Sequence, residues 1–122
     1  MFVLKIVTDF ASAHSLRNYP GDCSRLHGHN WGVEVSVCSE VLNDMGIAID
    51  FREIKNQTKA VAKRLDHQYL NEIQPFDVLN PTAENIAKYI FDEVGLLINT
   101  KDVKVKEVTI WETARSAVTY SQ

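Results

Sequence analysis

The sequence predicts an α+β protein with one antiparallel sheet of four strands and two helices packed on one face of it. Residues 2–13, 29–40 and 102–113 alternate between apolar and other side chains, as half-buried strands do, and residues 118–121 fit a last short strand. Between residues 40 and 102, apolar side chains recur at helical spacing in two segments. The order strand, strand, helix, helix, strand, strand lacks the alternation of a parallel sheet, so it favours helices gathered on one face.

The first helix is expected after a turn at residues 42–46 and a short strand at residues 47–49. Asp50 is the expected N-cap, and Glu53 three residues later completes a pattern like a capping box. The side chains expected to face the core repeat at helical spacing and are Phe51, Ile54, Thr58, Val61 and Leu65.

The second helix is expected to begin near Asn80-Pro81-Thr82, after an irregular stretch at residues 66–80. Thr and Asn are favoured as N-caps, and Pro is tolerated in the first turn. The predicted buried face of this helix consists of Ile86, Tyr89, Ile90 and Val94.

Length and composition indicate one domain, residues 1–122, of an ordinary globular class, with 45% hydrophobic and 24% charged residues. The net charge of −3 argues against a nucleic-acid partner and favours a small-molecule ligand. The longest apolar run, residues 94–98, is far short of the ~20 residues that cross a bilayer, so no membrane span is expected. The N-terminus alternates and carries Lys5 and Asp9, unlike a signal peptide, and we therefore expect a cytoplasmic protein.

Three of the four histidines lie at the ends of two neighbouring strand patterns, and they predict a metal site. His27 and His29 are two residues apart on a strand, so both rings share one face, at a spacing of about 6.6 Å along the chain. His14 ends the preceding strand pattern and is the expected third ligand. Three imidazoles suit Zn²⁺ and leave a fourth position open for substrate. The alternative is that all three are merely polar residues at strand ends and in a loop.

The two cysteines are expected to be thiols in a reducing cytosol, and they need separate explanations. Cys38 lies inside an alternating strand pattern, where a buried and inert thiol is the usual case. Cys23 lies in a loop beside His27, where a nearby cation can stabilise the thiolate.

Six motifs in order along the chain are similar to those of the 6-pyruvoyl-tetrahydropterin synthase and 6-carboxy-tetrahydropterin synthase (QueD) family. They are FASAH at 10–14, CSRLHGHN at 23–30, IDF at 49–51, LDHQYLN at 65–71, PTAEN at 81–85 and ET at 112–113. The resemblance implies a tunnelling fold (T-fold), in which trimers close their sheets into a barrel and two trimers stack as a homohexamer. Residues 114–117 depart from the family pattern.

The resemblance also implies the roles of individual side chains. Zinc would lie on His14, His27 and His29, and Glu112 would anchor a pterin ring. A proton-transfer group would comprise Cys23, Asp66 and His67, and Thr82 is a further candidate for substrate binding. Each has a simpler explanation: Asp66-His67 as a polar helix end, Glu112 as a solvated strand end and Thr82 as a helix cap.

The expected activity is that of a zinc-dependent lyase acting on 7,8-dihydroneopterin triphosphate. The product would be 6-carboxy-5,6,7,8-tetrahydropterin, with loss of triphosphate and acetaldehyde, as in queuosine biosynthesis. The short spacing from Cys23 to His27 resembles the carboxy-forming enzymes. One alternative is the pyruvoyl-forming synthase, which eliminates triphosphate only. Another is a non-catalytic module in which Cys23 closes the zinc site as a fourth ligand.

Overall fold

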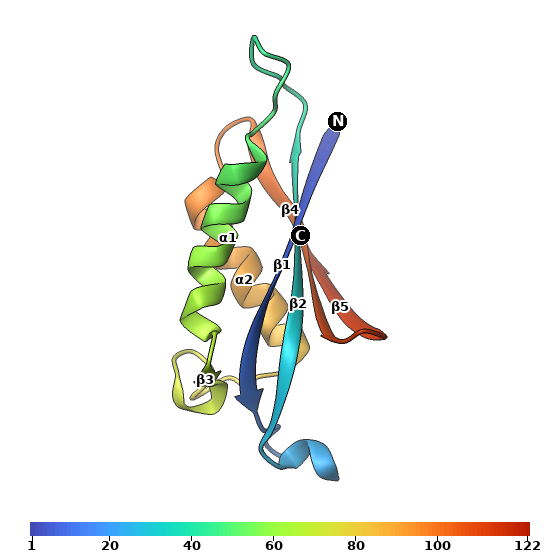
Figure 1. Ribbon diagram of the computed structural model, residues 1–122, viewed down its shortest axis with the longest axis vertical. Coiled ribbons are helices and arrows are strands. Elements are labelled where there is room, and N and C mark those ends of the chain that lie inside the picture. The colour runs from blue at the N-terminus through green and yellow to red at the C-terminus, as the bar shows by residue number, and fades with distance from the viewer.

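A computed structural model describes the chain from residue 1 to residue 122, apart from the side chain of Cys23. Four long strands form an antiparallel sheet: β1 (Phe2–His14), β2 (His27–Ser39), β4 (Val103–Thr113) and β5 (Ser116–Ser121). Both helices, α1 (Phe51–Leu65) and α2 (Ala83–Ile98), lie on the same face of the sheet (Figure 1). The predicted α+β class and its element order are thus confirmed.

The sheet has five strands rather than the predicted four. The fifth is β3 (Gln68–Tyr69), which pairs in parallel with Ser12 and Ala13 of β1 and gives the order β3-β1-β2-β4-β5. Two residues are too few to show an alternating pattern, so the sequence does not reveal this strand.

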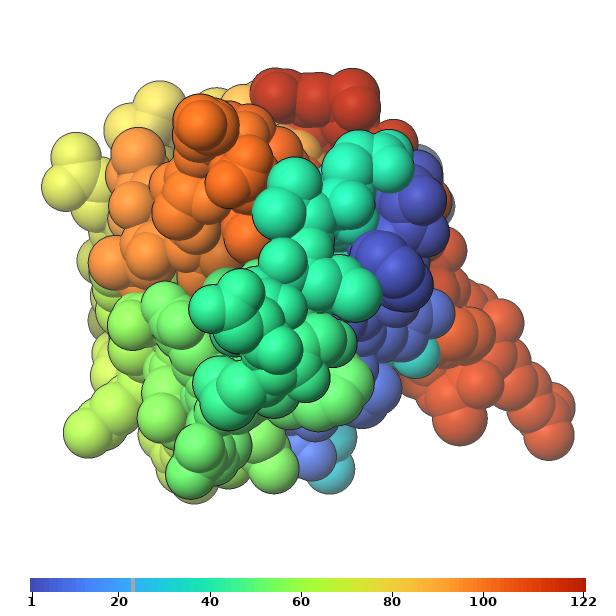
Figure 2. Space-filling view, turned by 90° about the horizontal axis from the view of Figure 1, so that it is seen from above, coloured from blue at the N-terminus to red at the C-terminus, as the bar shows by residue number. Residues whose placement is uncertain are grey.

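The strand predicted at residues 47–49 is wrong. The side chain of Asn43 forms hydrogen bonds with the backbone of this segment. Its Oδ1 accepts from Met45 N at 2.9 Å and from Ile47 N at 3.1 Å. The segment therefore closes on itself as a loop instead of pairing with a strand. Figure 2 looks down on this end of the molecule, where the loop (turquoise) covers the centre and the β4–β5 hairpin (orange-red) projects to one side.

Helix α1 begins as predicted, with Asp50 as N-cap, although its carboxylate accepts from Arg52 N at 2.8 Å. Four of the five side chains predicted to face the core are buried. Phe51 is the exception at 58% exposed, because it occupies the first turn beyond the packed part of the sheet. There it lines an apolar depression together with Phe2 and Leu4.

Helix α2 begins after Thr82, whose hydroxyl accepts from Asn85 N at 3.1 Å, as predicted. Ile86, Ile90 and Val94 are buried. Tyr89 is only half-buried, with its ring edge against Phe76. None of the described helices is long and apolar enough to cross a membrane.

The core lies between the sheet and the helices, and a bulge in β4 keeps that strand's apolar side chains on the helix side. Ser36 of β2 pairs with Glu107, but Val37 pairs with Val105, so Lys106 is an extra residue. The extra residue shifts the alternation by one, because successive side chains point to opposite faces. Buried positions therefore change parity along β4, from Val103 and Val105 to Val108 and Ile110.

Candidate metal centre and substrate pocket

Three histidine rings meet at one end of the sheet, on its helix-covered face. His14 is the last residue of β1 and lies opposite His27, the first residue of β2, in the antiparallel register. His29 follows two residues later on the same face. The ring centroids are 4.5 Å apart for His14 and His27, 4.8 Å for His27 and His29, and 5.1 Å for His14 and His29. The structure thus brings the three predicted metal ligands together.

Two of the rings are held from behind by backbone carbonyls. The Nδ1 atom of His14 lies 2.7 Å from the Pro81 carbonyl oxygen, and that of His27 lies 2.7 Å from the Arg25 carbonyl oxygen. A carbonyl only accepts, so each Nδ1 carries the hydrogen and donates it. In the neutral ring, Nε2 then presents a lone pair, which is the arrangement that orients imidazole ligands in metal sites.

Burial favours neutral rings here. It lowers the pKa of His14, which is 1% exposed, and the neighbouring imidazoles lower it further, against the bond to Pro81. Burial also lowers the pKa of His29, although the charge of Glu112 opposes this. Among the described residues, neither His14 Nε2 nor His29 Nε2 has a hydrogen-bond partner. A buried polar atom without a partner is costly, and a metal ion would satisfy both atoms.

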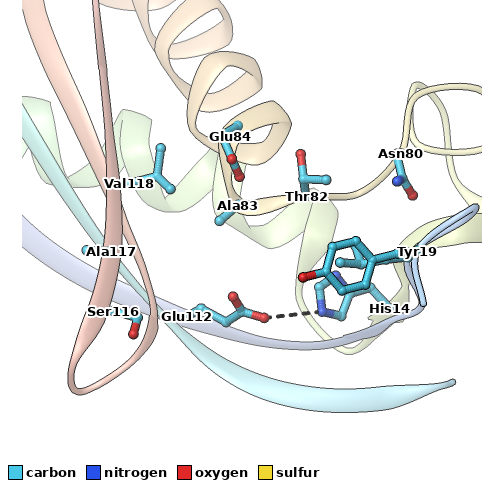
Figure 3. Close-up of a pocket in the computed structure, with 11 residues that line it drawn as sticks. His14, Tyr19, Asn80, Thr82, Ala83, Glu84, Glu112, Ser116, Ala117 and Val118 are labelled. Carbon is cyan, nitrogen blue, oxygen red and sulfur yellow. Dashed lines mark ion pairs between the residues drawn. The ribbon is translucent and has the colours of Figure 1, made fainter. Parts of the chain in front are cut away.

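Glu112 of β4 also belongs to the cluster. Sequence reasoning did not predict this, because it gave Glu112 only the role of anchoring a pterin ring. Its Oε1 lies 3.1 Å from His29 Nε2. The same oxygen lies 3.7 Å from His14 Nε2, the contact marked by the dashed line in Figure 3. One donor atom from each of the four side chains lies within 4.8 Å of all the others. Imidazole and carboxylate are zinc ligands, so this donor set fits Zn²⁺.

Two backbone irregularities direct Glu112 to the site. The bulge at Lys106 turns the alternate positions after it, Val108, Ile110 and Glu112, toward the helix-covered face. Further along, Trp111 pairs with Ala117 and Thr113 with Ser116, so Glu112 is itself the unpaired residue of a second irregularity. Bulges commonly redirect side chains beside active sites, and no sequence pattern reveals them in advance.

A cavity of about 320 Å³ adjoins the cluster, and one further predicted residue, Thr82, lines it. His14 and Glu112 lie on one side of it, and Thr82 and Glu84 at the start of α2 lie opposite (Figure 3). Tyr19 and Asn80 form the wall beside His14, and β5 forms the other wall through Ser116, Ala117 and Val118. Thr82 thus lines the cavity while it also caps α2.

Asp66 and His67 form a pair as predicted but do not line this cavity. Asp66 Oδ2 lies 2.8 Å from His67 Nδ1, and Asp66 Oδ1 accepts from Ala11 N at 2.9 Å. The bond from Ala11, and then that from His67, lowers the pKa of Asp66. The His67 side chain is 83% exposed and lines a second depression, together with Ala13, Asn30 and His29.

The remaining predicted residue, Cys23, lies outside the described residues, and its role stays a prediction. Cys38 is a free thiol but is only half-buried rather than buried. This position on β2 alternates with Val35 and Val37, so the thiol lies on the sheet face away from the helices.

A family model described as 6-pyruvoyl tetrahydropterin synthase matches residues 4–122. The 6-carboxy-5,6,7,8-tetrahydropterin synthase of Synechocystis is 33% identical, over 98% of this chain and 93% of the relative. The enzyme of that name from Aquifex aeolicus is 30% identical, over 82% of this chain and 76% of the relative. The solved structure of Caenorhabditis elegans 6-pyruvoyl tetrahydropterin synthase matches with a TM-score of 0.89 at 26% identity, and the match covers 99% of this chain and 95% of that one.

The resemblance drawn from the six motifs is thereby confirmed, and so is the T-fold topology that it implied. Because the family model covers nearly the whole chain and the relatives align over most of their own length, this chain belongs to the 6-pyruvoyl tetrahydropterin synthase family.

Proposed function

We propose that this chain is a zinc-dependent 6-carboxy-5,6,7,8-tetrahydropterin synthase that acts on 7,8-dihydroneopterin triphosphate in the cytoplasm. The observation that carries the proposal is a cluster of buried imidazole nitrogens without partners, beside a cavity that also contains Glu112. The cavity of about 320 Å³ has the size of a small-molecule site. The names of two relatives, 6-carboxy-5,6,7,8-tetrahydropterin synthases, support a pterin as the class of ligand.

His14, His27 and His29 would hold the metal, which would act as a Lewis acid toward oxygens of the substrate side chain. Pro81 and Arg25 contribute through their carbonyls, which fix the tautomers of His14 and His27. Trp31 packs its ring edge-on against His14 and His29, at centroid separations of 4.9 and 5.0 Å, and limits their rotation.

Glu112 would hold the pterin ring. Its carboxylate can accept the paired N–H groups of a 2-amino-pyrimidinone in a bidentate arrangement. Thr82 lies across the same cavity, and its hydroxyl hydrogen is free to donate because the oxygen already accepts from Asn85 N.

Cys23 would remove a proton from the substrate side chain, and His67, oriented by Asp66, would carry the second proton transfer. In a single chain, His67 does not line the cavity but a second depression, which His29 also lines. A second copy can supply it, because His67 immediately precedes β3 at one edge of the sheet while the cavity wall is β5 at the other edge. Edge-to-edge closure of several sheets would bring one copy's His67 beside the next copy's cavity, which supports the homohexamer expected from the resemblance.

The pyruvoyl-forming reaction is the second candidate, because the solved C. elegans enzyme of that name matches this fold with a TM-score of 0.89. The two reactions differ in what they consume and release. Elimination alone converts the substrate to 6-pyruvoyl-tetrahydropterin and triphosphate. The carboxy-forming reaction also takes up one water and releases acetaldehyde.

The test is mass analysis of the products formed from 7,8-dihydroneopterin triphosphate by the zinc-loaded protein. We expect 6-carboxy-5,6,7,8-tetrahydropterin together with equimolar acetaldehyde. A pyruvoyl product without acetaldehyde would establish the second candidate. If neither product forms with a protein shown to contain zinc, both assignments are wrong.

A further inference from the structure

We propose that Glu112 is the fourth ligand of the metal when the cavity is empty, and that it leaves the metal when a pterin ring enters. The first half concerns the resting centre and stands on the geometry of the cluster. The second half rests on the proposed function, because it gives the same carboxylate the task of holding the ring.

The first observation is the orientation of His14 toward Glu112. Because His14 Nδ1 donates to the Pro81 carbonyl, the neutral ring has only a lone pair at Nε2, the atom that faces Glu112 Oε1 at 3.7 Å. Two electron-rich atoms face each other with no hydrogen between them. A cation between the two atoms would turn this repulsion into attraction.

The second observation is the spacing of the donor atoms. Two ligands held 2.0–2.1 Å from a tetrahedral zinc ion lie roughly 3.3–3.4 Å apart. Glu112 Oε1 lies 3.1 Å from His29 Nε2 and 3.7 Å from His14 Nε2, on either side of that value. The contact between Glu112 Oε1 and His29 Nε2 is short, but it is not a hydrogen bond. In the described part of the chain, His29 Nε2 has no hydrogen-bond partner.

The third observation is the surroundings of the carboxylate. Glu112 is 33% exposed, and among the described residues its carboxylate approaches the nitrogen of a basic side chain only at His14 and His29. It is also the unpaired residue of the β4–β5 irregularity, at the boundary between the cluster and the cavity. A residue outside the regular ladder can turn between two ligands with less disturbance than one held by strand pairing on both sides.

The exchange would couple substrate arrival to the opening of the metal. With the cavity empty, three imidazoles and one carboxylate complete a closed site. When the N–H groups of the ring take the carboxylate, the fourth position is freed for an oxygen of the same substrate. Glu112 would thus couple the two binding events rather than serve only the ring.

The test uses protein loaded with Co²⁺, whose visible absorption reports the number and type of its ligands. Spectra are recorded for the unmodified protein, for Glu112→Gln and for Glu84→Gln, before and after addition of neopterin, which lacks the triphosphate. Glu84→Gln is the matched control, because Glu84 lines the same cavity but lies outside the donor cluster. Competition with a chelator gives the Zn²⁺ affinity of each protein.

Without neopterin, we expect the spectrum of Glu112→Gln to differ from that of the unmodified protein, and that of Glu84→Gln to match it. Zinc affinity of Glu112→Gln should be at least about 10-fold weaker. Addition of neopterin should also change the spectrum of the unmodified protein. This last measurement needs no variant, so it tests the exchange even if Glu112→Gln folds poorly.

Identical spectra of Glu112→Gln and the unmodified protein, without neopterin, would show that Glu112 is not a ligand. An unmodified spectrum that does not respond to saturating neopterin would overturn the exchange. Neither result depends on turnover, so both are distinct from a failure of the proposed reaction, which only product analysis reveals.

Discussion

The two ring nitrogens of His14 contact different parts of the molecule. Its Nδ1 donates to the carbonyl of Pro81, just before α2, while its Nε2 faces the other rings. The ring is almost fully buried, so it has no water to replace either partner. The cluster therefore depends on each ring individually, since the chain offers no spare imidazole nearby.

We predict that His29→Ala lowers the zinc content of the purified protein. The variant leaves two imidazoles and a carboxylate, and no other side chain of the described cluster can take the place of the lost imidazole. Metal analysis of the purified protein measures the effect. His67→Ala is the control, because His67 lies outside the cluster, and it should retain about one zinc per chain. Full zinc content in His29→Ala would contradict the assignment.

We also predict that the metal-free protein loses stability as pH falls below neutrality. Burial lowers the folded-state pKa of His14 and His29, whereas in the unfolded chain they take up protons near pH 6.5. Below that pH the unfolded state binds more protons than the folded state, so folding weakens. The stability is fully present above about pH 6.5 and is lost as pH falls toward the folded pKa values.

Urea unfolding of the metal-free protein from pH 8 to pH 5 measures this dependence. His29→Gln should flatten it, because one titrating group is removed. An equal slope in His29→Gln and in the unmodified protein would show that the buried ring does not titrate in this range.

The two cysteines give a matched pair for the chemical step. We predict that Cys23→Ala retains zinc and fold while the rate falls at least ~100-fold, the usual contribution of a general base. Cys38→Ala should be nearly silent, because Cys38 lies on the face of the sheet away from the histidines. Loss of zinc from Cys23→Ala would instead support Cys23 as a structural ligand.

Sequence reasoning found the histidines because strand pairing follows simple alternation, which places His14, His27 and His29 on one face. It assigned Glu112 to the correct face of β4 but could not foresee its approach to the imidazoles. That approach depends on where the extra residues of β4 lie, and any of several positions would satisfy the same apolar pattern.

At the level of elements, the segment before α2 is fastened to the end of β1 by polar side chains. The Arg17 guanidinium donates to the carbonyls of Leu79, Asn71 and Phe76. The Asn80 side chain pairs with both backbone groups of Arg17, at 2.9 Å to its N and 3.1 Å to its O. These bonds fix the position of the Pro81 carbonyl, which holds His14.

We predict that Arg17→Met lowers the free energy of unfolding by about 1–2 kcal/mol, because two partly buried carbonyls and one exposed carbonyl lose their donor. The change should also weaken zinc binding through the His14–Pro81 contact. Urea unfolding and chelator competition measure the two effects. Arg25→Met is the control, since the Arg25 side chain is exposed and makes no hydrogen bond among the described contacts. Equal stability of the two variants would contradict the role of Arg17.

Sequence patterns predicted both helices because Asp50 and Thr82 are effective caps and the apolar stripes are long. They failed at the loop of residues 40–50 and at β3, where structure depends on single contacts. Asn43 replaces a strand partner for Ile47, and the hydrogen bond from His67 N to the Ala11 carbonyl at 2.6 Å leads the chain into β3. Contacts of this kind leave no periodic signal in the sequence.

At the level of the whole molecule, both edges of the sheet have unpaired backbone. Most of β1 has no neighbour on its outer side, since β3 pairs with only two of its residues, and β5 is the opposite edge. Bare edges of this length are usually covered by another chain. The proposed role of His67 in proton transfer also requires a second chain, because His67 does not line the cavity of its own chain.

We predict that co-expression of His29→Ala with His67→Ala restores activity that neither variant has alone. In mixed assemblies, an intact zinc cluster from one chain meets an intact His67 from its neighbour. The measurement is product formation by the purified mixture, with sedimentation to verify hexamers. If the mixture stays inactive while hexamers form, each site draws all its groups from a single chain.

The position of β5 has a consequence for thermodynamic linkage. Residues 116–118 wall the cavity, and the same strand is the free edge of the sheet through which a second copy would attach. A ligand that orders this strand also prepares the surface on which assembly depends. Because coupling free energy is reciprocal, a pterin that tightens the assembly must itself bind more tightly as protein concentration rises. A pterin affinity measured at one protein concentration would then apply only to that concentration. The affinity therefore has to be measured over a range of protein concentrations.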